Sequence, residues 1–156
     1  MLKRMVTGAH TTLLMAKEWL LTNVSEGAKC PCCGQNAKVY RRKLHATIAK
    51  ALIQLHHAGG SEDYQHTPSL PGDTHEISQA SWWGLIEEEN YSVRPDGGRA
   101  GFWKLTEEGN RFVLGVGAIP EYAFVYNGNV VELQGLGVTI HDCLGTKFDY
   151  LELINS

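Results

Sequence analysis

Residues 82–114, WWGLIEEENYSVRPDGGRAGFWKLTEEGNRFVL, decide the expected fold of this chain. The stretch opens on an apolar segment that predicts the end of a helix, and two strand-like segments, YSVR and GFWKL, follow. Pro95-Asp96-Gly97-Gly98 lies between them and predicts a tight hairpin, because glycine tolerates the positive φ that such turns require. Thr106 followed by two glutamates predicts the start of a new helix. The stretch therefore predicts a helix, a hairpin and a capped helix, in that order.

This pattern resembles the MarR- and PadR-type winged-helix regulators, which read GLIE…DGR…LTEEG at this place. The resemblance covers residues 75–114 and implies a winged helix-turn-helix, which is an α+β fold. His75–Glu88 then takes the position of the recognition helix, and Asp73 with Glu76 resembles a capping box at its start. The residues expected on its core face are Ile77, Ala80, Trp83, Leu85 and Ile86. Those expected to be exposed toward DNA are Ser78, Gln79, Ser81 and Trp82.

The length of 156 residues is that of one domain with appendages. We expect three segments: 1–37 with a helix and a cysteine turn, 38–118 with the winged helix, and 119–156 with a small β-hairpin and a short helix. No apolar run approaches the roughly 18–20 residues of a membrane span. Lys17 and Glu18 interrupt the apolar stretch near the N-terminus, which argues against a secretory signal. We therefore expect a cytoplasmic protein without a membrane partner.

The N-terminal segment contains a pattern typical of metal sites in Cys30-Pro31-Cys32-Cys33-Gly34. A preceding amphipathic helix is expected over residues 11–24, with Thr11 or Thr12 as its N-cap. Cys-Pro-x-Cys-Gly is the turn found in zinc ribbons and rubredoxin-like sites. Its spacing lets Cys30 and Cys33 reach one ion, while Cys32 is expected to point away.

This cysteine turn supplies half of a tetrahedral zinc site, and the sequence does not identify the other half. The remaining candidate ligands are Cys143, His141, His66, His56, His57 and His75. Three interpretations stay open: a zinc (Zn) site, a tight turn that holds no metal, and a pair of redox-active thiols.

The longest helix is expected over Lys38–Ala58, ending at Gly59-Gly60. Its buried stripe is expected to comprise Val39, Leu44, Ile48, Ala51, Leu52 and Leu55. The basic residues on its other faces include Lys38, Arg41, Arg42 and Lys43. They are either a solvated helix face or contacts to DNA phosphates, which position a protein without reading sequence.

The charge of the chain is unevenly placed, although its net value is −3. Residues 1–60 hold nine of the fourteen Lys and Arg residues but two of the seventeen acids. A local basic surface attracts phosphates whatever the global charge. In the hairpin, Arg94 and Arg99 are candidates for a phosphate or minor-groove contact, whereas Glu87–Glu89 would repel the DNA backbone. An exposed Trp82 would instead stack on a base or anchor a protein partner.

The C-terminal segment predicts a hairpin over residues 121–134, because Asn127-Gly128 is the strongest short hairpin signal. His141-Asp142-Cys143 does not share a helix face, so a nucleophile and base there are not expected, and we expect no enzyme. Over its whole length the chain resembles small phage and prophage proteins with an N-terminal CPxCG turn. The leading hypothesis is a phage or prophage transcriptional regulator that binds double-stranded DNA, with a homodimer as one expected form. The alternative is a protein-binding module that engages a host protein.

Overall fold

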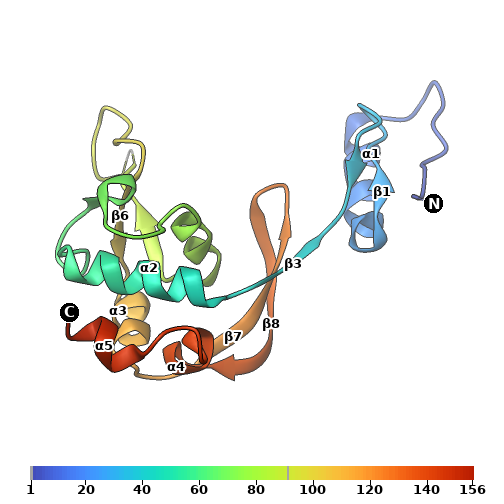
Figure 1. Cartoon of the computed structure of the whole chain (residues 1–156). Helices are drawn as coiled ribbons and strands as arrows, with labels where there is room; N and C mark the ends of the chain where they lie inside the picture. The colour runs from blue at the N-terminus through green and yellow to red at the C-terminus, as the bar shows by residue number, and fades with distance from the viewer. Residues whose placement is uncertain (1, 91) are drawn as a thin grey trace. The chain divides into compact units, whose positions relative to one another are not determined.

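The computed structural model describes residues 2–90 and 92–156 and has a mixed α+β architecture with several antiparallel sheets (Figure 1). The chain divides into two compact units. The first comprises the residues up to Arg42 together with Phe124–Glu132, and the second comprises Lys43–Ala123 together with Leu133–Ser156. Residues 133–156 therefore group with the central segment, which differs from the separate segment 119–156 that the sequence predicted.

A short helix and a small hairpin form most of the first unit. Its elements are α1 (Leu13–Asn23), the 3-10 helix η1 (Val24–Glu26), and the antiparallel strands β1 (Ala28–Lys29) and β2 (Asn36–Ala37). The Thr12 hydroxyl accepts a hydrogen bond from the Met15 N–H over 3.1 Å, which confirms the predicted cap of this helix. The buried hydrophobic side chains among the described residues of this unit are small: Ala16, Val24, Ala28 and Val125.

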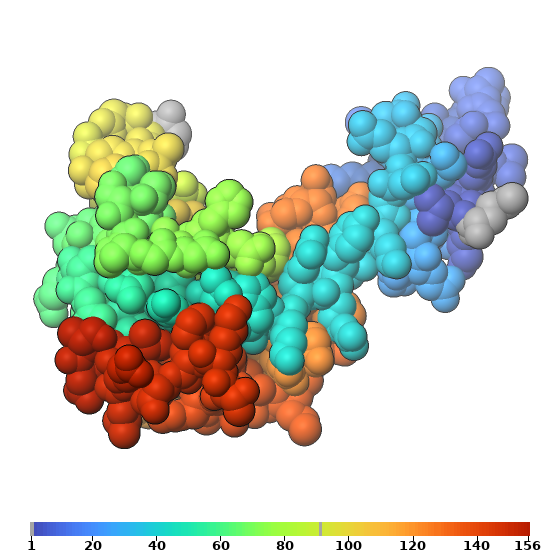
Figure 2. Space-filling model, viewed as in Figure 1, coloured from blue at the N-terminus to red at the C-terminus, as the bar shows by residue number. Residues whose placement is uncertain are grey.

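Helix α2 (Ala46–His57) is the centre of the second unit. Its buried residues are Ile48, Ala49, Ala51, Leu52, Ile53 and Leu55, which include most of the predicted stripe. The other helices of this unit are η2 (Thr67–Ser69), η3 (Ile77–Trp83), α3 (Glu107–Val113), α4 (Ile140–Leu144) and α5 (Tyr150–Ile154). α2 packs against η3, α3, α4 and α5, and Figure 2 shows the C-terminal residues (red) lying against it (teal). One helix thus supports elements from the whole length of the unit.

A three-stranded antiparallel sheet lies beside α2. Its strands are β4 (Gln65–His66), β5 (Ile86–Glu88) and β6 (Phe102–Leu105), in the order β4-β6-β5. β6 pairs with both neighbours, with His66 opposite Phe102 and Ile86 opposite Leu105. β5 is therefore an edge strand, and its following loop leads back into the central strand.

A second three-stranded sheet has the order β3-β7-β8, from β3 (Tyr40–Lys43), β7 (Ile119–Tyr126) and β8 (Asn129–Val138). Residues of these strands belong to both units. Asn127 and Gly128 join β7 to β8 with φ values of 52° and 75°, as a type I′ turn requires. The hairpin predicted from Asn127-Gly128 is confirmed.

The helix predicted over Lys38–Ala58 is wrong in its first part, because Tyr40–Lys43 forms strand β3 and the helix begins at Ala46. The Leu44 N–H donates to the Glu121 carbonyl over 2.9 Å, so the backbone here pairs with a distant segment. Aromatic and β-branched residues such as Tyr40 and Val39 suit an extended chain. Tertiary pairing thus overrides the helical preference of Arg and Lys. Val39 is half-buried and does not belong to the helical stripe.

The helix predicted over His75–Glu88 is also wrong in its extent. The segment forms the short 3-10 helix η3, which ends at Gly84 with φ 71°, and Ile86–Glu88 continues as strand β5. Glycine permits this left-handed end, and the Thr106 N–H then donates to the Leu85 carbonyl over 3.0 Å. The predicted core residues of the segment, Ile77, Ala80, Trp83, Leu85 and Ile86, are all buried.

The strand predicted for YSVR is wrong where the structure describes it. Tyr91 lies outside the described residues, and Ser92 and Val93 lie in a turn. The Asn90 side chain accepts from the Ser92 N–H over 2.9 Å, and the Asn90 carbonyl accepts from the Arg94 N–H over 2.8 Å. These N–H groups are therefore not available to a strand ladder, as is usual after asparagine in turns.

The helix predicted after Thr106 is confirmed as α3, and the Thr106 hydroxyl accepts from the Gly109 N–H over 3.1 Å. The predicted helical tail corresponds to α4 and α5, and α4 begins with a capping box between Thr139 and Asp142. Among the described residues, no helix is long and apolar enough to cross a membrane.

Gly109 of α3 lies against the backbone of Leu85, the residue just before β5, and this contact provides a test of the fold. A Cβ atom at Gly109 would lie 1.9 Å from the Leu85 carbonyl oxygen. In an ordinary helix Gly→Ala stabilises by about 0.5–1 kcal/mol. Because backbone must move here, we expect Gly109→Ala to lower the free energy of unfolding by more than about 2 kcal/mol. Chemical denaturation measures this change.

The matched control for this change is Gly8→Ala, because a Cβ at Gly8 meets no atom within 4 Å and its φ is not positive. We expect the control to leave the free energy of unfolding unchanged within about 0.5 kcal/mol. A Gly109→Ala protein as stable as the wild type would show that α3 does not approach Leu85 this closely.

Candidate functional site

The basic residues before α2 lie on an extended segment of the chain. Lys38, Arg41 and Arg42 are exposed in the first unit, and the Arg42 guanidinium lies 5.4 Å from the centre of the Tyr40 ring. Adjacent residues of a strand point to opposite faces, so Arg41 and Arg42 project in different directions. Lys43 is also exposed but pairs with the Glu121 carboxylate over 3.4 Å. Lys38, Arg41 and Arg42 are thus exposed to solvent, as is Lys43, whose ammonium pairs with a carboxylate.

The segment predicted to contact the DNA bases forms η3, and it exposes fewer polar groups to solvent than expected. Ser78 is exposed, whereas Gln79, Ser81 and Trp82 are half-buried. The Ser81 hydroxyl donates to the Ser78 carbonyl over 2.7 Å, so its donor is used within the segment. Of the candidate residues for base contact, the longest polar side chain is that of Gln79.

The two neighbouring tryptophans have different roles. Trp83 is buried, and its indole N–H donates to the Pro120 carbonyl over 2.8 Å. Trp82 is half-buried, with its ring centroid 6.3 Å from that of Trp83. A buried indole needs such an acceptor, so Trp83 is a structural anchor. Trp82 is the member of the pair with surface available to a ligand or partner.

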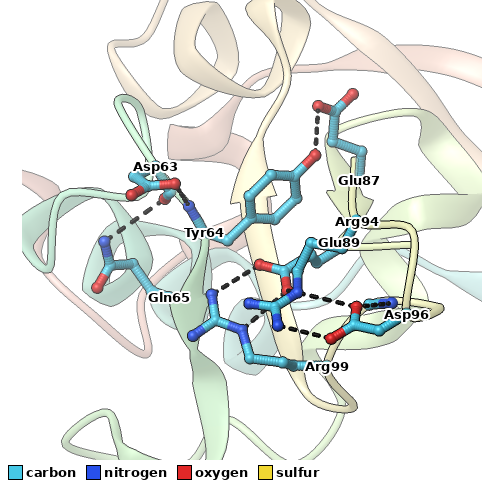
Figure 3. A network of polar contacts seen from close by, with 9 residues as sticks. Asp63, Tyr64, Gln65, Glu87, Glu89, Arg94, Asp96 and Arg99 are labelled. Carbon is cyan, nitrogen blue, oxygen red and sulfur yellow. Dashed lines mark hydrogen bonds and ion pairs between the residues drawn. The ribbon is translucent and has the colours of Figure 1, made fainter. Parts of the chain in front are cut away.

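The two arginines predicted to contact DNA from the hairpin are held by carboxylates (Figure 3). Arg99 makes two hydrogen bonds to Glu89, at 2.8 Å and 2.7 Å, and Arg94 makes two to Asp96, at 3.0 Å and 2.7 Å. Arg94 also lies 3.5 Å from Glu89. Glu89 is 4% exposed, so its charge is compensated where water cannot reach it. The cluster closes the loop between β5 and β6.

These contacts change the acidity of both carboxyl groups. Hydrogen bonds from Arg99 hold the pKa of Glu89 below its ordinary value, against the opposing effect of burial. Hydrogen bonds from Arg94 lower the pKa of Asp96 to about 2. The sequence analysis did not identify this cluster, although the acids before the turn and the arginines around it were a visible signal.

A second polar cluster joins the neighbouring strands. The Tyr64 hydroxyl donates to Glu87 over 3.3 Å, and the Lys104 ammonium lies 3.3 Å from the same carboxylate (Figure 3 shows the tyrosine contact). Lys104 also lies 5.1 Å from the centre of the Tyr64 ring. Burial, and then the charge of Glu87, raise the pKa of Tyr64. The glutamate run thus stabilises this sheet in addition to contributing negative charge.

The cysteine turn connects β1 to β2. The Cys30 N–H donates to the Gln35 carbonyl over 2.8 Å, the Gly34 N–H donates to the Cys30 carbonyl over 2.8 Å, and Gly34 has φ 74°. Backbone N–H groups of Cys33 and Cys32 donate to the Cys30 sulfur and lower the pKa of its thiol. The Cys33 thiol is also within hydrogen-bonding reach of this sulfur, and so is the Cys32 thiol, contrary to the expectation that Cys32 points away. Two sulfurs close together, with N–H groups directed at one of them, fit the first half of a zinc-thiolate site.

The other predicted zinc ligands have their own surroundings in the second unit. Burial, and then Asp142, raise the pKa of the Cys143 thiol to about 12. The His141 ring lies 4.3 Å from that of Tyr150, and the His57 ring contacts the Leu153 carbonyl over 2.8 Å. The His66 ring contacts the Ser69 hydroxyl, His56 is half-buried and His75 is exposed. Within residues 2–90 and 92–156, no group of three or more His, Cys, Asp or Glu residues is arranged to hold a metal.

Comparison with known proteins adds no relative to this description. No protein-family model matches the chain, and no curated protein and no solved structure matches it significantly.

The Glu89 cluster predicts a specific dependence of stability on pH. The folded pKa values of Glu89 and Asp96 lie below those of the unfolded chain, so their contribution is present above about pH 4.5 and is lost as the pH falls toward about 2. We expect the denaturation midpoint of the wild type to fall over this range. Glu89→Gln removes the shared charge, so its midpoint should be lower at about pH 5 and should change less on acidification.

Glu88→Gln is the control for this measurement, because Glu88 is the preceding residue and its side chain is exposed. It should follow the wild-type pH profile. If Glu89→Gln also follows that profile, the cluster does not couple protonation to stability.

Proposed function

We propose that this chain is a winged-helix protein that binds double-stranded DNA and acts as a transcriptional regulator in a phage or prophage. The observation that carries the proposal is the order of elements in the second unit. A core helix α2 is followed by strand β4, the short helix η3, the β5–β6 hairpin and helix α3, with the sheet order β4-β6-β5. A winged helix has a helix pair, a two-stranded wing and a third strand that completes the sheet, and this order is compatible with it.

In this proposal the basic extended segment contacts phosphates. Lys38, Arg41 and Arg42 are exposed and lie in the half of the chain that carries most of the positive charge. Contacts from such residues neutralise phosphates and release counterions, which supplies affinity without sequence preference.

In this proposal η3, at the position of the recognition helix, contacts the DNA bases. Gln79 can form a bidentate contact with adenine, and Ser78 or Ser81 can contact either type of base pair. Trp82 supplies an aromatic surface beside them. Arg94 and Arg99 first shape the β5–β6 loop through Glu89 and Asp96, so their contribution to phosphate binding is smaller than that of unpaired arginines.

A second candidate function is a protein-binding module that engages a host protein. Two observations favour it: the arginines of the β5–β6 loop are neutralised, and Glu87 and Glu88 are exposed on the edge strand β5. An edge strand can accept an added strand from a partner, and carboxylates there would select a basic segment. Both candidates are binding functions rather than enzymatic ones.

The phosphate contacts are tested by the double variant Arg41→Ala/Arg42→Ala. We expect binding to a pool of unrelated duplexes to weaken uniformly, and the slope of log affinity against log salt to decrease by about 2, because each phosphate contact contributes about 0.9. Fluorescence anisotropy at several salt concentrations measures both quantities.

The control is Lys17→Ala/Lys147→Ala, which removes the same charge from two other exposed positions. It should leave the slope nearly unchanged. If both double variants reduce the slope equally, the binding is diffuse attraction to positive charge. If folded wild type is not retained on DNA at low salt, the host-protein candidate replaces DNA binding.

A further inference from the structure

The cysteine turn supplies two candidate ligands, whereas structural zinc takes four ligands in a tetrahedron. Cys30 and Cys33 belong to one hydrogen-bonded turn and line the same hollow. Among the described residues, no group of three or more His, Cys, Asp or Glu residues is arranged to hold a metal. The two residues outside the description are a methionine and a tyrosine, Met1 and Tyr91, which are not zinc ligands of this kind.

The two thiols also face open space rather than a packed interior. A hollow of about 310 Å³ in the first unit is lined by both cysteines and by the apolar surfaces of Leu20, Tyr40 and Tyr126. Cys33 is exposed and Cys30 is half-buried. A second pair of ligands can therefore approach from outside the unit without displacing a core side chain.

Helix α1 of the same unit independently indicates a missing partner. It is apolar on several sides, yet Ala16 is its one buried residue. Leu13 and Leu14 are 74% and 64% exposed, and Leu21 is 57% exposed. A helix that is hydrophobic around its circumference is normally buried. A unit with so small a core usually needs a metal or an oligomeric partner to be stable.

We propose that one zinc ion is shared by two copies of this chain, held by Cys30 and Cys33 of each copy. Four thiolates then complete the tetrahedral site, and a two-fold axis through the ion relates the two turns. Such an interface places the same surface of both copies together. α1 also lies at this contact, because its residue Leu20 lines the hollow beside the two cysteines.

The backbone of the turn is arranged to support such a site. The Cys30 N–H donates to the Gln35 carbonyl and the Gly34 N–H donates to the Cys30 carbonyl, each over 2.8 Å, and these bonds fix the positions of both cysteines in the turn. Cys32 occupies the variable position between the two ligands, and Cys143 belongs to the second unit. Neither is required for the shared ion. The shared site does not depend on whether the chain binds DNA.

The test measures the zinc content and the mass of the same reduced, purified full-length protein. Native mass spectrometry should show a dimer that carries one zinc ion, and metal analysis should give one ion per two chains. Removal of the ion by a strong chelator should shift the protein to the monomer, and added zinc alone should restore the dimer.

Single variants assign the ligands. Cys30→Ser and Cys33→Ser should reduce the bound zinc to near zero and yield a monomer, whereas Cys32→Ser and Cys143→Ser should retain both the ion and the dimer. Cys33→His, which keeps a zinc ligand, should restore part of the zinc binding. Circular dichroism and chemical denaturation show whether each variant is folded.

Three results would overturn the shared site. The first is one zinc ion bound to each monomer, which would place all four ligands within one chain. The second is a dimer that survives chelation unchanged. The third is folded wild type that retains no zinc, including a protein in which Cys30 and Cys33 have oxidised to a disulfide.

Discussion

The burial of α2 is the constraint on which the second unit depends. Ile48, Leu52, Ile53 and Leu55 are completely inaccessible, and fully burying each such side chain stabilises by about 1.5–3 kcal/mol. The elements that pack against α2 come from the middle and the end of the unit. η3, β6 and α3 belong to its middle, and α4 and α5 are its last helices. The position of the β5–β6 hairpin and of η3 is therefore set by packing on α2. The polar cluster around Glu89 then fixes the loop that this packing leaves outside the core.

The first unit is stabilised in a different way. Its helix, hairpin and cysteine turn are held by local hydrogen bonds, such as those from Cys30 and Gly34 across the turn, and its buried side chains are small. Local hydrogen bonds contribute only about 0.5–1.5 kcal/mol each after exchange with water. They define the conformation of the turn but do not replace a core. This contrast is the physical reason to look for stabilisation by a ligand or a second copy in this part of the chain.

The features that the sequence predicted correctly are those determined by a few neighbouring residues. Thr12 and Thr106 cap helices through their own hydroxyls, and Asn127-Gly128 makes a tight turn wherever it stands between two strands. The boundaries that were wrong depend on distant pairing. Residues 40–43 have side chains compatible with a helix but join β7, and the segment after Gly84 joins β6. The candidate site shows the same difference between features set by neighbouring residues and features set by distant pairing. The cysteine turn was visible in the sequence, whereas the pairing of Arg94 and Arg99 required knowledge of where Glu89 is buried.

Carboxylates neutralise both arginines of the β5–β6 loop, and this determines where on the chain positive charge is available. Arg94 and Arg99 are held by carboxylates, so the proposed attraction to phosphate depends on the exposed cations Lys38, Arg41 and Arg42. They lie within twelve residues of Cys30, on the same unit as the half site for zinc. A second copy joined through that ion would bring a second set of these cations. Because counterion release adds for each phosphate contacted, the salt dependence of a dimer would be about twice that of one chain. The metal would then control affinity for a polyanion without touching it, through the number of basic segments that bind together.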